Sequence, residues 1–155
     1  MELARNLKVD SVSRLRPTPP RCVRPEQTVA EAVVLMRQYA TGCVLVCRGE
    51  TLVGIFTERD LMRRVLAVGQ PLSLPVAAFL TPDPVGVHPK DPVGVAVRRM
   101  EEGGYRHLPV VDENGRPVGV LSVKRIVHYL VEHFPATIYN LPPNPDRFPL
   151  EAEGA

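Results

Sequence analysis

Two polar residues, Thr57 and Asp60, lie where a strand-like run of apolar residues gives way to a helical pattern. The apolar run at residues 52–56 is typical of a strand, and the apolar residues within 61–66 recur at helical spacing. A helix start presents unpaired backbone N–H groups and a partial positive charge, which suit a phosphate group or the polar edge of a ligand. The same two residues form a Thr-x-x-Asp helix start, so helix capping alone is an alternative role for them.

The same junction returns about 65 residues later, where residues 119–125 read GVLSVKR against GIFTERD at 54–60. The neighbouring elements repeat as well, at an offset of 64 before the turn at 112–115 and of 65 after it. The offset changes because this turn is one residue longer than its counterpart in the first copy. Self-similarity at a fixed period predicts two copies of one structural unit.

Each unit is expected to contain a short strand, a helix, two longer strands and a second helix. In the first unit, Thr28 and Glu31 form a capping box for a helix that we expect to end at Gly42. In the second unit, we expect Asp91 to cap the equivalent helix, with Pro92 at its first position. The remaining elements are expected as strands at 43–47, 52–56, 108–111 and 117–121, and as helices from 58 to about 68 and from 123 to 134.

The fold class predicted from this order is α+β, an α/β sandwich of two pseudo-symmetric β-α-β-β-α repeats. Each repeat is too small to bury its own sheet face, so we expect the two sheets to pack against each other. The expected boundaries are 1–15 for an N-terminal helix, 16–78 for the first repeat, 79–134 for the second, and 135–155 for an extended, Pro-rich C-terminal tail.

The composition is ordinary for a soluble protein, with 45% hydrophobic and 23% charged residues. A net charge of +2 is too balanced to indicate a nucleic-acid partner, and no apolar run is long enough to span a bilayer. The first 15 residues lack the apolar core of a signal peptide, which favours a cytoplasmic protein.

The three cysteines suggest small buried side chains rather than a disulfide framework. We find no catalytic constellation and no shared face of metal ligands, so we predict neither an enzyme nor a metal site.

The two junctions, together with the stretch YRHLPV at residues 105–110, resemble the tandem cystathionine-β-synthase (CBS) domain pair of stand-alone bacterial and archaeal proteins. The resemblance covers residues from about 16 to 134. It implies a regulatory module that senses cellular energy or metabolite state by binding AMP, ADP, ATP or S-adenosylmethionine in clefts between the two halves. It also implies a homodimer, with an adenine nucleotide as regulatory ligand and no obligatory cofactor.

The resemblance assigns Asp60 to the two ribose hydroxyls, which a carboxylate can bind together, and Thr57 to sugar or phosphate. Arg106 and His107 are expected to reach the same cleft from the second half and to bind phosphate, unless they form an ordinary exposed strand end. Tyr105 either stacks on a base or simply packs. The full set of expected ligand-binding residues is Ile55, Thr57, Asp60, Thr81, Val85, Tyr105, Arg106, His107 and Lys124, of which Thr81 and Val85 match family positions near the adenine.

The second junction departs from the family pattern because Arg125 stands where Asp60 stands in the first. A guanidinium has no acceptor for a ribose hydroxyl, so we expect the second cleft to be empty or weak for nucleosides. The residues around Lys124 resemble the regulatory subunit of AMP-activated protein kinase, where a lysine at this place serves phosphate. Lys124 is therefore expected either to reach the phosphates in the Asp60 cleft or to lie at a solvated helix end.

The principal alternative is a ligand-independent dimerisation or adaptor protein that docks a partner through its Pro-rich tail. A regulated protein partner is compatible with either function. RNA or DNA binding is disfavoured, because the chain has a nearly neutral charge and no stripe of basic and aromatic residues.

Overall fold

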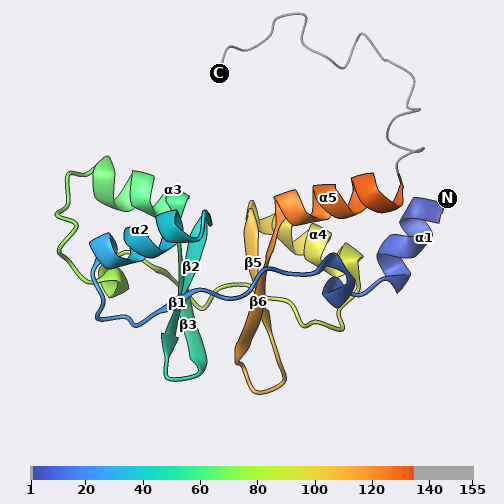
Figure 1. Cartoon of the computed structure of the whole chain (residues 1–155), viewed down its shortest axis with the longest axis horizontal. Coiled ribbons are helices and arrows are strands. Elements are labelled where there is room, and N and C mark those ends of the chain that lie inside the picture. The colour runs from blue at the N-terminus through green and yellow to red at the C-terminus, as the bar shows by residue number, and fades with distance from the viewer. Residues whose placement is uncertain (1, 135–155) are drawn as a thin grey trace, which may run out of the picture.

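The computed structural model describes residues 2–134, so the predicted C-terminal tail at 135–155 lies outside the described residues. Figure 1 shows two halves, each with a β-hairpin facing the other half and helices on the outside. The elements are α1 (Glu2–Val9), η1 (Val12–Leu15), β1 (Cys22–Val23), α2 (Val29–Gln38), β2 (Cys43–Arg48), β3 (Thr51–Thr57), α3 (Glu58–Asp60), η2 (Leu61–Leu66), η3 (Val76–Ala78), β4 (Thr81–Pro82), α4 (Val93–Gly103), β5 (His107–Val111), β6 (Pro117–Ser122) and α5 (Val123–His133).

The two sheets are built in the same way. The outermost strand of each sheet comes from the segment of chain that leads into the other half. In the first sheet the strand order is β1-β2-β3-β4, and β4 pairs antiparallel with β3. In the second sheet, β5 and β6 are extended by single bridges from Val87 to Val110 and from Thr18 to Val120. Thr18 belongs to the segment before the first repeat, so the chain crosses between the halves twice. These crossings hold the halves together through backbone hydrogen bonds.

Strand β2 is buried on both faces, because one face packs against helices and the other against the second sheet. Val44 and Val46 belong to the core of the first half, together with Phe56. Leu45 alternates with them and belongs to a smaller cluster that reaches Val120 on β6. The prediction of an α+β fold with two pseudo-symmetric repeats packed sheet to sheet is confirmed.

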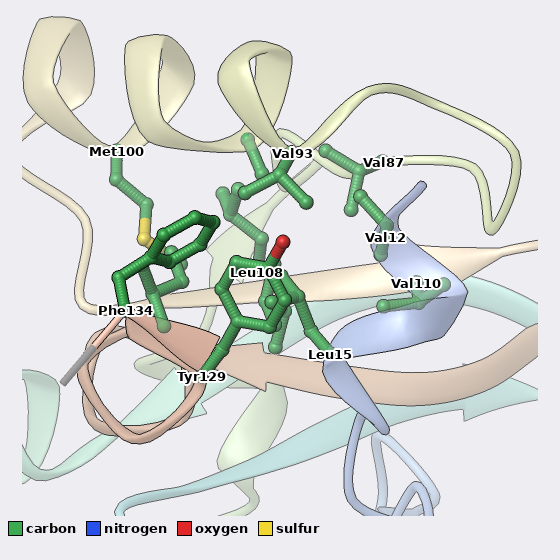
Figure 2. Packing of buried hydrophobic residues seen from close by; sticks show 12 residues of the cluster. Val12, Leu15, Val87, Val93, Met100, Leu108, Val110, Tyr129 and Phe134 are labelled. Carbon is green, nitrogen blue, oxygen red and sulfur yellow. The ribbon is translucent and has the colours of Figure 1, made fainter. Parts of the chain in front are cut away.

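The N-terminal segment packs with the second half of the molecule, although it precedes the first half in sequence. Val12 and Leu15 are buried beside Leu108, as Figure 2 shows. The hydroxyl of Tyr129 on α5 donates a hydrogen bond to the carboxylate of Asp10, which follows α1. In Figure 1, α1 accordingly lies beside α5. The N-terminal segment therefore fills part of the second core.

The first capping box is present as predicted, whereas the expected cap at Asp91 is wrong by one residue. Thr28 and Glu31 form the reciprocal bonds at the start of α2. Helix α4 begins at Val93 with Pro92 as its N-cap and no side-chain cap. The Asp91 carboxylate instead accepts a hydrogen bond from the backbone N–H of His88, at 2.8 Å. That bond closes the turn before the helix and leaves the cap position to proline.

The helix expected from residue 58 to about 68 differs in its geometry. Only α3 is α-helical, and the following η2 is a π-helical stretch, in which for example the backbone N–H of Ala67 bonds to the carbonyl of Met62 five residues earlier. Such widened turns are rare and are frequently found at functional sites. Helix α2 also ends earlier than predicted, at Gln38 rather than at Gly42. Within residues 2–134, no helix is long and apolar enough to cross a membrane.

Candidate functional site

A cavity of about 680 Å³ opens between the two halves at the first strand-to-helix junction. Its walls come from α3 and η2 on the first half, from the segment around β4, and from the loop that leads into β5 on the second half. The structure places eight of the nine expected ligand-binding residues around this one cavity, namely Ile55, Thr57, Asp60, Thr81, Val85, Tyr105, Arg106 and His107.

The Asp60 carboxylate lies at the wall of the cavity, and it is almost buried, with 7% of the residue exposed. Its Oδ2 atom accepts hydrogen bonds from the backbone N–H and the hydroxyl of Thr57, both at 3.0 Å. Its Oδ1 atom accepts from the hydroxyl of Thr81 at 3.3 Å and lies 3.5 Å from Nε of Arg64. The capping role is therefore present through Oδ2, while Oδ1 faces the Thr81 hydroxyl and Arg64.

Cationic side chains gather on the same cavity from both halves. Arg106 and His107 enter from the start of β5, whereas Arg63 and Arg64 enter from η2. Arg59 crosses the cavity, where its Nη1 atom donates to the carbonyl of Gly104 at 3.2 Å. Because arginine and neutral histidine are hydrogen-bond donors, the set suits a phosphate group.

Sequence reasoning missed Arg59, Arg63 and Arg64, and also missed Asp83, which lines the cavity with an unusual positive φ of 45°. The pair of Asp60 and Arg64 could have been found, because residues four apart on a helix are neighbours. The position of Asp83 could not, since it depends on the crossing of the chain from one half to the other.

Tyr105 and Val85 form the exposed apolar part of the wall, with 38% and 39% of their surfaces exposed. The Tyr105 ring packs directly on the backbone of Gly103, where a Cβ would lie 2.0 Å from the ring. The ring is thus held by packing, and it still faces the cavity. Both roles that were open for Tyr105, packing and stacking, are compatible with this position.

Lys124 does not line the Asp60 cavity. It lies on a second cavity of about 540 Å³, together with Arg125 at the start of α5. The two cavities are related by the repeat and share Gly42 and His107 in their walls. A Cβ at residue 42 would lie 2.9 Å from Cε1 of His107, so the histidine ring packs on the glycine between the two cavities.

Two copies of the family model for the CBS domain match this chain, at residues 12–67 and 76–132. The chain belongs to the CBS domain family. As a CBS pair, it is 31% identical over 115 residues to the CBS domain-containing protein YhcV of Bacillus subtilis, a match that spans 74% of this chain and 81% of YhcV. Several other relatives are much longer, and the match spans only 14% to 20% of them.

Solved structures with the same fold include CBS proteins that hold AMP. The CBS domain protein PAE2072 from Pyrobaculum aerophilum, complexed with AMP, has a TM-score of 0.71 and 27% identity, over 79% of this CBS pair and 99% of that chain. CBSX2 in complex with AMP has a TM-score of 0.67 and 25% identity, over 79% and 96% of the two chains. Both likenesses cover nearly the whole of the solved chains.

His107 predicts a pH dependence of stability. Burial lowers the pKa of His107 below its ordinary value of 6.5, and Arg106 lowers it further, against an opposing effect of Glu58. In the unfolded chain the imidazole takes up its proton more readily, so the free energy of unfolding should fall as the pH drops below about 6.5. We expect His107→Gln to reduce this slope in urea titrations between pH 7.5 and 5.5. An unchanged slope would assign the acid sensitivity to other groups.

Proposed function

We propose that this CBS pair is a regulatory module that binds one adenine nucleotide per chain in the cavity beside Asp60. One observation supports the proposal above all others: a carboxylate on the first half and two hydrogen-bond donors on the second half, Arg106 and His107, line the same cavity. The carboxylate can accept from a sugar diol, while Arg106 and His107 can donate to a phosphate. The AMP complexes of the two CBS proteins compared above support an adenosine-containing ligand.

In the proposed complex, the two ribose hydroxyls bind the Oδ1 side of Asp60 and take the place of the Thr81 hydroxyl and of Arg64. Thr57 keeps its bonds to Oδ2, so the helix start is preserved. Arg64 is then free to turn toward the phosphate. The adenine lies among the less polar wall residues, where Ile55, Val85 and Tyr105 offer apolar surface.

Binding at this place touches both halves of the molecule, so a ligand can change how they pack. It can do so only through different affinities for the two arrangements. A regulated protein partner would detect that change. The proposed role is therefore sensing rather than catalysis.

Isothermal titration calorimetry with AMP, ATP and S-adenosylmethionine tests the proposal on the full chain. We expect saturable binding of at least one of these ligands, with one molecule per chain. The three ligands share adenosine and differ in charge, so their order of affinity will show whether the arginines select a phosphate. Absence of binding for all three, together with an unchanged thermal midpoint at millimolar ligand, would reject the proposal.

One observation favours the alternative function of a ligand-independent dimerisation or adaptor protein. Both oxygens of Asp60 already have partners within the chain, through Thr57, Thr81 and Arg64. A purely structural junction would have this appearance. The same titrations separate the two functions, because an adaptor should show neither heat nor stabilisation with any adenosyl ligand.

We further propose that the chain forms a homodimer through exposed apolar side chains on η2 and α5, the helices that follow the two strand-to-helix junctions. Met62 and Val127 occupy equivalent places in the two repeats, and 59% and 52% of their surfaces are exposed. We expect light scattering to give a mass about twice 17.1 kDa, and Met62→Glu combined with Val127→Glu to give a monomer. Val118→Glu, at a residue exposed by 48% on β6, is the matched control and should remain dimeric. A monomeric native chain would contradict the proposal.

A further inference from the structure

The second cavity has kept the shape of a ligand site, but its chemistry has changed. It lies at the start of α5, is bounded by the segment around Arg21 and the end of α2, and has a volume of about 540 Å³. Each part corresponds to a part of the first cavity at the repeat offset, with Ser122 in the place of Thr57 and Arg125 in the place of Asp60. The second cavity therefore has an equivalent opening but an arginine at the position where the first has a carboxylate.

The walls of the second cavity are entirely cationic or neutral. Arg21, Lys124 and Arg125 line it together with His107 and His128, and no acidic residue within 2–134 does so. The first cavity, in contrast, combines its arginines with three acidic wall residues, Glu58, Asp60 and Asp83. An accumulation of one sign of charge in a concave site raises the local concentration of the opposite ion.

These cations have not been neutralised by neighbouring acids. In the part of the chain that the structure describes, Arg21, Lys124 and Arg125 form no ion pair, whereas His128 pairs with Glu132 at 3.0 Å. The Arg21 guanidinium lies over the ring of Tyr39, with 3.6 Å between Cζ and the ring centroid, which holds it at the cavity wall. The start of the 11-residue helix α5 adds its partial positive charge.

The same residues select against a ribose. Arg125 offers five donors and no acceptor, so it cannot accept hydrogen bonds from the hydroxyls of a sugar diol as a carboxylate does. The Ser122 hydroxyl accepts from the backbone N–H of Arg125 at 3.1 Å, and the Thr41 hydroxyl donates to the carbonyl of Cys43 at 3.2 Å. With no carboxylate in its described wall, the second cavity lacks the charged acceptor that Asp60 offers to a ribose in the first.

We infer that the second cavity binds phosphate groups without a sugar, as a site for a compact, multiply charged oxyanion such as a diphosphate or triphosphate. An arginine fork suits the oxygens of a phosphate, and Lys124 supplies a point charge. Binding of a free oligophosphate does not depend on the proposed nucleotide site, whereas binding of a nucleotide's terminal phosphates rests on it. Two sources of the phosphate are distinguishable: a free oligophosphate, or the terminal phosphates of a nucleotide that reaches past His107 from the first cavity.

The test is calorimetric titration of the full chain with inorganic pyrophosphate in the absence of nucleotide. We expect saturable binding that weakens at least about tenfold in the double variant Lys124→Ala/Arg125→Ala, because each lost charge-assisted contact lowers affinity. The variant Lys8→Ala/Arg98→Ala removes the same charge from exposed positions on α1 and α4 and should bind as the native chain does. Thermal melts verify folding, and Arg125→Gln replaces the double variant if that fails to fold.

Two further arms locate the phosphate source. Asp60→Ala should keep pyrophosphate binding, since Asp60 does not line the second cavity. If the source is a nucleotide tail, the native chain should prefer ATP over AMP, and Lys124→Ala/Arg125→Ala should remove that preference. Three results would overturn the inference. The first is an absence of saturable pyrophosphate binding, and the second is loss of that binding in Asp60→Ala. The third is an equal loss of affinity in the Lys124→Ala/Arg125→Ala and Lys8→Ala/Arg98→Ala variants.

Discussion

Replacing Asp60 by alanine should lower the affinity of the chain for AMP by about 100-fold or more, as measured by calorimetry. The carboxylate is the acidic group best placed to accept from both ribose hydroxyls, because within residues 2–134 its Oδ1 atom contacts only the Thr81 hydroxyl and Arg64. Each hydrogen bond to a charged group contributes roughly 1.5–3 kcal/mol. Loss of two such bonds therefore corresponds to at least about two orders of magnitude in affinity.

The chain contains a matched control for the structural part of this effect. Asp60 also serves as the third residue of a capping box with Thr57, and Glu31 does the same with Thr28 at the start of α2. Glu31 does not line the Asp60 cavity. Glu31→Ala should cost about 1 kcal/mol or less of stability through the lost cap bond, because Glu31 is exposed. Asp60→Ala should cost more, because the almost buried carboxylate also holds the Thr81 hydroxyl and Arg64. Only Asp60→Ala should also weaken AMP binding. Equal affinity in both variants would remove the carboxylate from the ligand site and favour the adaptor function.

Replacing Phe56 by alanine should lower the free energy of unfolding by about 3–5 kcal/mol. Phe56 is fully buried in the core of the first half, on the strand that ends at Thr57, so its removal leaves a cavity under the junction. Urea unfolding measures the effect. Val118→Ala, at a half-exposed residue of β6, should change stability by less than about 0.5 kcal/mol.

The same variant distinguishes a damaged fold from a damaged site. At a concentration of 100 times its dissociation constant, AMP should add about 2.7 kcal/mol to the stability of the native chain. A similar increment in Phe56→Ala would show that the binding residues keep their positions once the chain is folded. An AMP-dependent increment below about 1 kcal/mol in Phe56→Ala would mean that the junction relaxes around the missing ring and that the binding residues lose their positions.

Local features of this protein could be predicted because they depend on neighbours in the sequence. The capping boxes at Thr28 and Thr57 follow from residue types three positions apart. The apolar run at residues 43–47 likewise predicted a strand. Repetition of these patterns at a constant offset then predicted two similar halves.

Features that depend on contacts between distant residues could not be read in the same way. The capping motif at Asp60 was visible in the sequence, but its second partner, Thr81, arrives only because β4 crosses to the first sheet. The placement of Lys124 in the second cavity rather than the first depends on how the halves face each other.

The sequence alone thus determined the repeated elements, the caps and the types of side chain that could bind a nucleotide. The tertiary structure decided which of those side chains share a cavity, and it separated a mixed-charge cavity at Asp60 from a cationic one at Arg125. The physical reason is that helix and strand periodicity acts over a few residues, whereas a cavity forms where segments distant in the sequence are brought together by backbone pairing and core packing.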